Sequence, residues 1–363
     1  MRIGILTFHR AINYGAVLQC YALYKTLREL GHDVEVIDYR PDYIEKYRTF
    51  FYKKDFLQPG IVGKIRYLLS CLLTIGSKRK VASKFDGFLS KYIRASDIVF
   101  TVQDIPHNYD VIVFGSDQIW GLQHGGGMDP IYYGQFPKEG AKFVAYATSV
   151  GLIELLEGEA LVKFKKYLQA FDGISVRESS LNHFLLERCT IKSQIVCDPS
   201  LLLERDEYIK LAHAPNDENY VLLYSLTEDP ATFYFAKRVA KQIKAKVIQM
   251  KAVLNPVHKK DYIRENLAPE DFIGYIQHAR CVITNSFHAT SFSIIFGKDF
   301  YTLRRPTNNG RSQFLLEKLG LSDRLVDSSQ NVLYRSIDYG GIGLKLDTFR
   351  NESLNFILEE IDA

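Results

Sequence analysis

Short apolar runs alternate with amphipathic stretches along most of the chain, and this alternation restricts the fold more than any other feature. Residues 3–8 are apolar, a polar loop follows, and residues 33–39 are apolar again. Between them, five apolar residues recur at the three- and four-residue spacing of one helix face: Ala16, Cys20, Leu23, Leu27 and Leu30. Gly31 stands where such a helix usually ends. The pattern predicts a βαβ unit with parallel strands.

The same alternation continues in two series, which the charged and irregular residues 199–219 separate. The first series has strand-like runs at residues 111–114, 143–146, 174–176 and 194–197. The second has alternating strand-like and helical runs at residues 220–226, 232–243, 246–250, 269–280, 281–284, from 289 onward, and 300–303. A chain of 363 residues exceeds what one core usually organises. We therefore expect an α/β protein with two Rossmann-like domains facing a cleft: residues 1–205, residues 206–343 and a C-terminal helix at 344–363.

Residues 40–94 interrupt this alternation and carry 13 Lys/Arg against 4 Asp/Glu. We expect two or three helices lying outside the first sheet as an insertion. Basic residues flank the apolar residues 67–75: Lys46, Arg48, Lys53, Lys54, Lys64, Arg66, Lys78, Arg79 and Lys80. The pattern fits either weak docking on an anionic membrane surface or a packed helix with a solvated basic face.

Composition excludes several classes of protein. The five cysteines have no CxxC spacing, which argues against a disulfide framework or a zinc site. The first apolar run is too short for a signal peptide, and no stretch reaches the length of a membrane span. We expect a cytoplasmic protein, at most peripheral to the inner face of the membrane, with no metal, no cofactor and no nucleic-acid partner.

Polar residues follow several predicted strands, where open α/β sheets bind their ligands. The loop at Asn13, Tyr14 and Gly15 fits an anion site at a helix N-terminus or a plain helix cap. Asp117, after the strand at 111–114, fits a base that accepts a hydroxyl proton or a turn cap. Arg177, after the next strand but one, fits an anion ligand or an ion pair with Glu178 or Asp172.

The run at residues 281–298 is the richest in polar groups. A buried strand there ends in Asn285, Ser286 and His288, and a helix follows. These groups fit anion binding and proton transfer, although a single histidine is more often a core or capping residue. Three arginines come next, which would complete a site for a dianion or form a solvated face: Arg304, Arg305 and Arg311.

Seven motifs give the chain its resemblance to a known family. They occur in order at residues 4–8 (GILTF), 13–19 (NYGAVLQ), 115–120 (GSDQIW), 146–151 (YATSVG), 175–178 (SVRE), 198–202 (DPSLL) and 284–288 (TNSFH). In this order they resemble the polysaccharide pyruvyltransferase family over roughly residues 1–310. The resemblance implies a fold similar to GT-B glycosyltransferases, phosphoenolpyruvate as donor and a saccharide acceptor, free or lipid-linked, in bacterial exopolysaccharide or capsule synthesis.

The resemblance also implies roles for individual residues. Arg177 and His288 take the places of the family's arginine and histidine, as an anion clamp and as an acid or phosphate ligand, and Asp117 is our candidate base. The expected substrate-binding residues are Asn13, Tyr14, Gly15, Gln19, Ser116, Ser149, Asn285, Ser286, Arg304, Arg305 and Arg311. A GT-B glycosyltransferase that uses a nucleotide sugar, or a non-catalytic carbohydrate- or anion-binding protein, remains an alternative.

Overall fold

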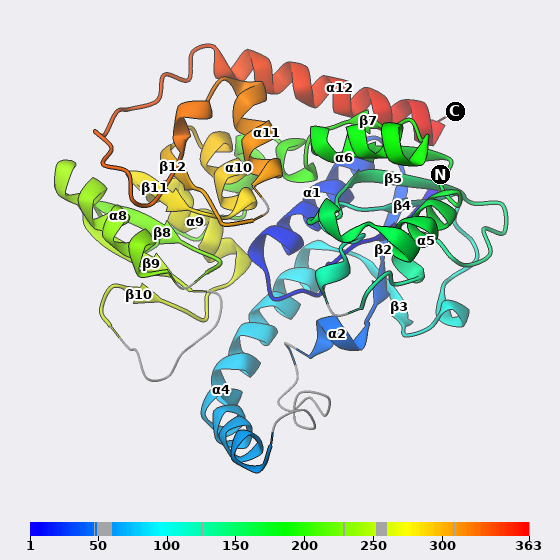
Figure 1. The fold of residues 1–363 in the computed structure, drawn as a ribbon, viewed down its shortest axis with the longest axis horizontal. Helices are drawn as coiled ribbons and strands as arrows, with labels where there is room; N and C mark the ends of the chain where they lie inside the picture. Colours follow the sequence, from blue (N-terminus) through cyan, green and yellow to red (C-terminus); the bar gives the residue numbers. More distant parts are fainter. Residues whose placement is uncertain are drawn as a thin grey trace.

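The computed structural model describes residues 1–46, 48, 60–124, 126–227, 229–251, 260–307 and 309–362, which form two parallel sheets flanked by helices (Figure 1). The first sheet has seven strands in the order β3-β2-β1-β4-β5-β6-β7. Its strands are β1 Arg2–Leu6, β2 Asp33–Tyr39, β3 Ala95–Val99, β4 Val111–Phe114, β5 Lys142–Thr148, β6 Gly173–Val176 and β7 Gln194–Ile195. The second has six, in the order β10-β9-β8-β11-β12-β13. Its strands are β8 Tyr220–Tyr224, β9 Lys246–Met250, β10 Ile263–Arg264, β11 Cys281–Thr284, β12 Asp299–Leu303 and β13 Leu325–Val326.

The predicted βαβ unit is confirmed at the centre of the first sheet. Strand β1 pairs in parallel with β2 on one side and with β4 on the other. Helix α1, Tyr14–Glu29, connects β1 to β2, and the Asn13 side chain caps it by accepting hydrogen bonds from the backbone N–H groups of Gly15 and Ala16. Gly31 follows the helix with a φ of 91°, a left-handed conformation that glycine adopts without steric strain. The local sequence signals therefore decide both ends of this helix.

The remaining helices cover the faces of the sheets or connect them. They are α2 Asp42–Glu45, α4 Ile61–Tyr92, α5 Gly158–Leu168, α6 Ser179–Phe184, α7 Arg205–Ile209, α8 Pro230–Gln242, α9 Pro269–His278, α10 Phe287–Ile295, α11 Gly310–Leu319 and α12 Ile342–Asp362. Two sheets on either side of residue 205 confirm the expected α/β class with two units; the exact domain boundaries stay a prediction. None of the helices in the described ranges has the length and hydrophobicity that a membrane crossing requires.

The described part of residues 40–94 contains two helices, the short α2 and the long α4, in agreement with the expected two or three. Helix α4 has 32 residues, and no proline interrupts it. Its C-terminal half buries Val81, Phe85 and Phe88 in the core that also holds α1. Interior packing of this half therefore continues the helix through Gly76 and Gly87, although glycine disfavours helix interiors. Lys53 and Lys54, part of the predicted basic segment, lie outside the described residues.

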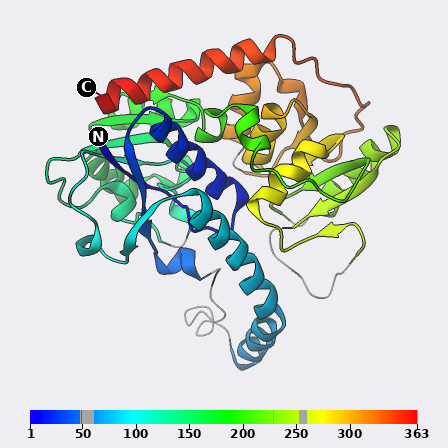
Figure 2. The ribbon, with the colours of Figure 1, turned by 180° about the vertical axis from the view of Figure 1, so that it is seen from behind.

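Helix α12 returns from the second sheet to the first (Figures 1 and 2). Ring contacts link Phe349 to Phe314 of α11 and Phe356 to Tyr146 of β5. The Ser353 hydroxyl accepts a hydrogen bond of 2.8 Å from the backbone N–H of Cys197. The helix predicted at the C-terminus is thus present, and it connects the two halves of the molecule.

Candidate active site

A cavity of about 510 Å³ lies between the two sheets. Its walls come from the loop before α1, from α4, from the loops after β4 and β5, and from the N-terminal ends of α10 and α11. The polar and charged residues that line it are Asn13, Thr74, Ser77, Lys78, Asp117, Gln118, Gln123, Asn285, Ser286, His288, Arg305, Thr307, Arg311 and Ser312. The cavity lies at the carboxyl ends of strands from both sheets, as open α/β folds generally place their ligands.

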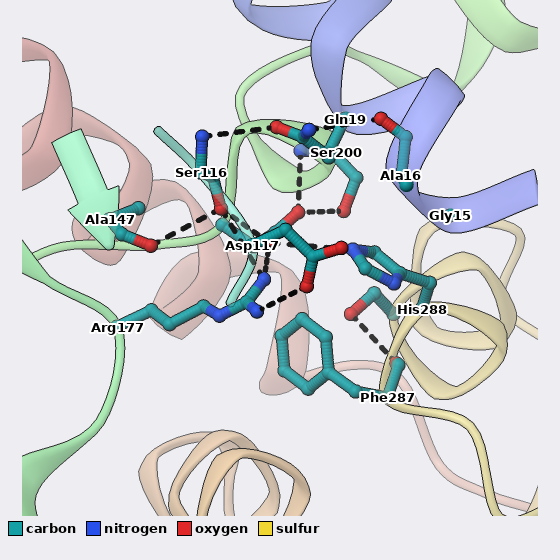
Figure 3. Close-up of polar contacts among 12 residues, drawn as sticks. Gly15, Ala16, Gln19, Ser116, Asp117, Ala147, Arg177, Ser200, Phe287 and His288 are labelled. Atoms are coloured by element: carbon teal, nitrogen blue, oxygen red, sulfur yellow. Dashed lines mark hydrogen bonds and ion pairs between the residues drawn. The ribbon is translucent and has the colours of Figure 1, made fainter. Parts of the chain in front are cut away.

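The two halves of the molecule meet at Gly15 and His288 (Figure 3). A Cβ atom added to Gly15 would lie only 2.1 Å from Nδ1 and 2.6 Å from Cβ of His288. Gly15 is therefore required for its lack of a side chain, because the imidazole of the second half occupies that space. His288 lies in the first turn of α10, which follows directly from strand β11.

His288 faces a buried carboxylate of the first half, that of Asp198. The Nε2 atom of His288 lies 3.6 Å from Oδ2 of Asp198, and among the residues described this nitrogen is buried without a hydrogen-bond partner. Burial alone would raise the pKa of Asp198, but the neighbouring His288 and Arg177 hold that pKa well below its usual range. Asp198 is thus an anion that lies beside the imidazole.

Asp198 was absent from the site residues predicted by sequence. It follows β7, caps the 3₁₀ turn Pro199–Leu201, and accepts hydrogen bonds from the backbone N–H and hydroxyl of Ser200. An Asp-Pro sequence at the end of an apolar run is typical of a simple turn cap. The sequence therefore does not indicate that Asp198 also contacts Arg177 and His288. The sequence signal that could have identified Asp198 as a site residue is its place in the motif at residues 198–202, one of the seven ordered motifs.

Arg177 is buried between two carboxylates and does not reach the wall of the cavity. Its Nη1 atom contacts Asp198, and its Nη2 atom donates a 2.9 Å hydrogen bond to Oδ1 of Asp117. The ion-pair alternative is therefore present, with Asp117 and Asp198 as partners instead of the expected Glu178 or Asp172. Its guanidinium also lies 5.0 Å from the ring centroid of Phe287.

Asp117 lines the cavity after strand β4, with a φ of 70°. Burial would raise its pKa, but the positive charges of Arg177, His288 and Arg311 lower the pKa to about 2. The carboxylate is therefore ionised at neutral pH and faces both Arg177 and the cavity.

Three predicted substrate-binding residues instead form hydrogen bonds that hold the loops after β4 and β5 in place. Ser116 is fully buried, and its Oγ lies 3.1 Å from Oδ2 of Asp198. Gln19 of α1 accepts a hydrogen bond from the Ser116 backbone N–H through its Oε1. The Ser149 hydroxyl donates to Oε1 of Glu178 at 2.7 Å. These three side chains are buried and away from the cavity wall, so their positions suit a supporting role.

In the second half, Asn285 and Ser286 line the cavity as expected, and both also have structural partners. The Asn285 side chain accepts a hydrogen bond from the Leu226 backbone N–H and donates one to the Thr227 hydroxyl. Ser286 caps α10. The two residues thereby fix the loop after β8 beside His288.

The three arginines divide between the cavity and the surface. Arg305 and Arg311 line the cavity, whereas Arg304 is exposed and away from it. Nη1 of Arg311 is 3.6 Å from Oδ1 of Asp117, and its buried Nε lacks a hydrogen bond within the described part of the chain. Burial and the nearby Arg177 lower the pKa of Arg311 to about 10. The cavity therefore contains a cation whose charge its protein neighbours do not satisfy well.

Two residues of the predicted anion loop have structural roles. Tyr14 is buried in the core, stacked on Phe272 with ring centroids 4.9 Å apart, and does not line the cavity. Asn13 lines the cavity but uses its side chain to cap α1. Lys78, which the sequence suggested only as part of a basic surface, instead reaches the cavity from α4.

Comparison with known proteins assigns the chain to a family. Residues 13–305 match a family model described as polysaccharide pyruvyl transferase. No curated protein matches the sequence significantly.

Solved structures share the general arrangement of the chain at low sequence identity. UDP-GlcNAc 2-epimerase from Neisseria meningitidis, bound to UDP-GlcNAc, is 11% identical with a TM-score of 0.47, over 100% of this chain and 93% of that one. The Methanocaldococcus jannaschii UDP-GlcNAc 2-epimerase complex is 11% identical with a TM-score of 0.44, over 97% and 100%. The glycosyltransferase SnogD from Streptomyces nogalater is 12% identical with a TM-score of 0.40, over 100% and 95%. Likeness at this level carries no argument about chemistry.

Proposed function

The chain belongs to the polysaccharide pyruvyl transferase family, and we propose that it transfers the pyruvyl group of phosphoenolpyruvate to two hydroxyls of a saccharide as a cyclic ketal. The cavity of about 510 Å³ is in the usual size range of roughly 300–1,000 Å³ for small-molecule sites. It collects groups from both halves of the molecule, so both halves would contribute to the reaction.

The observation that carries the choice of donor is the unsatisfied positive charge of Arg311. This buried cation lines the cavity together with Arg305 and His288. Its low pKa means that the protein alone stabilises its charge less well than water does. A ligand with both a carboxylate and a phosphate, as in phosphoenolpyruvate, would supply the missing negative charge. Arginine binds both groups well, because its planar donors match their oxygen geometry.

The reaction that we propose has two additions at one carbon. A saccharide hydroxyl gives up its proton and forms a bond to C2 of phosphoenolpyruvate, while C3 gains a proton and becomes a methyl group. The bond between C2 and the phosphate oxygen then breaks, a second hydroxyl bonds to C2, and its proton leaves with the phosphate. The product is a ketal and inorganic phosphate, with no change in total oxidation state.

His288 and Asp117 are the proposed catalytic residues. His288 either donates the proton to C3 or binds the phosphate, and the Asp198 carboxylate 3.6 Å from its Nε2 would orient the imidazole for either role. Asp117 would accept the proton of an attacking hydroxyl. With a pKa of about 2 it is a weak base, so it would act mainly by orienting and polarising that hydroxyl.

Arg177 fits a positioning role better than the anion clamp expected from the sequence. Both of its Nη atoms already bind carboxylates, and its side chain is nearly inaccessible. We therefore propose that Arg177 holds Asp117 and Asp198 at the spacing that the site needs, while Arg311 and Arg305 bind the donor.

The apolar side of the cavity would accept the saccharide. Phe8, Ile12, Ile44, Leu152 and Leu226 line it. Such surfaces can contact the apolar face of a sugar ring, and Gln118, Gln123 and Thr307 offer hydrogen-bonding groups beside them.

Donor binding tests this proposal directly. Phosphoenolpyruvate should raise the melting temperature of the protein, and UDP-sugars should not. Arg311→Gln should weaken that binding by about 10- to 100-fold, because a hydrogen bond to a charged group contributes about 1.5–3 kcal/mol. Arg304→Gln, which changes an exposed arginine nearby, is the matched control and should bind as the parent does.

Turnover completes the test. After incubation with phosphoenolpyruvate, a galactosyl or N-acetylmannosaminyl acceptor should gain the mass of one pyruvate less one water, with release of phosphate. Stabilisation by a nucleotide sugar alone would point to a glycosyltransferase. Phosphoenolpyruvate binding without turnover on any acceptor would favour a non-catalytic anion-binding protein.

A further inference from the structure

Helix α4 extends beyond both sheets and presents leucines to solvent. Its lower part leaves the body of the molecule in two opposite views (Figures 1 and 2). Leu68, Leu69, Leu72 and Leu73 are 40%, 56%, 63% and 66% exposed. Four adjacent exposed leucines are unusual on a protein surface, where large apolar side chains are normally scattered singly.

These four leucines share one helix face with two cations. Positions 68, 69, 72 and 73 are one and four residues apart, so they form a single stripe. Arg79 and Lys80 follow Leu72 and Leu73 by seven residues, about two turns, and therefore continue the same stripe. Both are exposed. We call Leu68, Leu69, Leu72, Leu73, Arg79 and Lys80 the outer stripe of α4.

The outer stripe is held away from the body because the other half of α4 is anchored. Val81, Phe85 and Phe88 are buried in the core. The Ser77 hydroxyl donates a hydrogen bond to Asn266, and Lys84 forms an ion pair of 3.5 Å with Asp271, both in the second half of the molecule. A continuous helix fixed at one end cannot fold its other end back onto the sheets.

We propose that the outer stripe of α4 docks on an anionic membrane surface, with the leucines in the interfacial region and Arg79 and Lys80 at the lipid phosphates. The charge of the helix favours an anionic membrane surface over a second copy of the chain as the partner of the outer stripe. From its first residue to Phe85 the helix has no Asp or Glu, but it has six Lys or Arg. A symmetric pair of such helices would bring like charges together, whereas an anionic surface complements them.

The docked helix would also bring the membrane surface to the cavity. Thr74, Ser77 and Lys78 line the cavity, and they lie along α4 between the leucines and its buried half. Ser77 is four residues beyond Leu73, about 6 Å along the helix axis. A saccharide attached to a lipid in that surface would therefore meet the cavity entrance. This step rests on the proposed function, whereas the docking itself does not.

Vesicle flotation tests the docking with the full-length protein. Vesicles containing phosphatidylglycerol should bind it, and pure phosphatidylcholine vesicles should bind it at least tenfold more weakly, with the difference shrinking at high salt. Leu72→Ser with Leu73→Ser should lower binding to the anionic vesicles at least tenfold. Leu333→Ser with Leu344→Ser, which changes two leucines that are each 75% exposed elsewhere, is the matched control and should not.

A charge variant gives an independent arm. Arg79→Glu with Lys80→Glu should abolish the preference for anionic vesicles, whereas Lys166→Glu with Lys192→Glu, at exposed positions of the first half, should keep it. Equal vesicle binding by the leucine variant and the parent would overturn the proposal. So would a parent dimer in sedimentation velocity that the leucine variant converts to monomer, because the stripe would then be a self-association surface.

Phosphoenolpyruvate binding separates this proposal from the proposed function. The leucine variant should keep the thermal stabilisation by phosphoenolpyruvate and its turnover on a water-soluble acceptor, because the outer stripe does not line the cavity. Normal vesicle binding without any response to phosphoenolpyruvate would leave the docking intact and refute the donor.

Discussion

At the scale of single residues, the contact between Gly15 and His288 decides whether the site can form. Glycine at this position is a steric requirement, since its backbone has no positive φ that would need glycine for another reason. The imidazole whose Nε2 lies 3.6 Å from Asp198 occupies the space that a side chain at position 15 would need.

Gly15→Ala should therefore lower turnover more than it lowers stability. The added methyl would meet the His288 ring 2.1 Å away and displace it from Asp198. We expect turnover to fall by about 10²-fold or more, the lower range of general acid–base contributions. Gly87→Ala is the control, because nothing lies within 4 Å of its added Cβ, and it should keep turnover with slightly higher stability. Unchanged kcat in Gly15→Ala would show that the position of His288 does not matter for catalysis.

At the scale of elements, the loops that follow three strands of the first sheet contribute to one buried ionic cluster. Asp117 follows β4, Arg177 follows β6 and Asp198 follows β7, and the arginine contacts both carboxylates. The cluster orders three loops that have little regular structure of their own. Its energetic contribution depends on both carboxylates remaining ionised.

This cluster predicts a specific loss of stability in acid. The pKa of Asp117 is lowered from 3.8 to about 2, so its ionised form contributes stability that is present above about pH 4 and is lost as pH falls toward 2. The difference corresponds to on the order of 2 kcal/mol at neutral pH. Asp117→Asn should flatten the acid limb of a curve of unfolding free energy against pH. Asp97→Asn, at an exposed position in β3, should leave that limb as in the parent. An identical acid limb in Asp117→Asn would assign the acid sensitivity to other carboxylates.

The sequence predicted elements well where local patterns determine them. Helix α1 has an Asn cap, an apolar stripe and a terminal glycine, so both of its ends could be placed. Helix α4 has weak amphipathicity and three glycines, and only its tertiary packing makes it one continuous helix. The sequence does not predict strands β3, β10 and β13. β10 and β13 have two residues each and no longer apolar run around them, unlike β7, and β3 is a mostly exposed edge strand without an apolar run.

The candidate site was predictable in part for the same reason. Asp117, His288 and Arg311 follow the polar-after-strand pattern, and the structure gathers them around one cavity. Tyr14 and Arg304 fit the pattern equally well but do not line the cavity. Tyr14 stacks on Phe272 in the core, and Arg304 is exposed to solvent. Partners that are distant in sequence, such as Asp198 for His288, cannot be identified from local spacing.

At the scale of the whole molecule, helix α12 connects the halves that form the cavity. Its first turns bury Leu346 and pack Phe349 against Phe314 of α11, and Lys318 of α11 forms an ion pair of 3.1 Å with Glu352. Its later turns pack Phe356 against Tyr146 of β5 in the first sheet. Truncating a packed side chain near the C-terminal end of α12 should therefore lower the stability of the first sheet and, through the helix, that of the second.

Phe356→Ala should destabilise both halves in one cooperative transition. Phe356 is 4% exposed, and truncating a buried phenylalanine to alanine costs about 3–5 kcal/mol. Trp120, the only tryptophan, lies in the core of the first half, so its fluorescence reports that half, whereas far-UV circular dichroism reports both. The two denaturant curves should coincide and shift together to lower midpoint in Phe356→Ala. Leu358→Ala, at a position that is 38% exposed on the same helix, should shift them much less. If fluorescence alone shifts while circular dichroism shows a second transition at the parent midpoint, the halves unfold independently and α12 does not couple them.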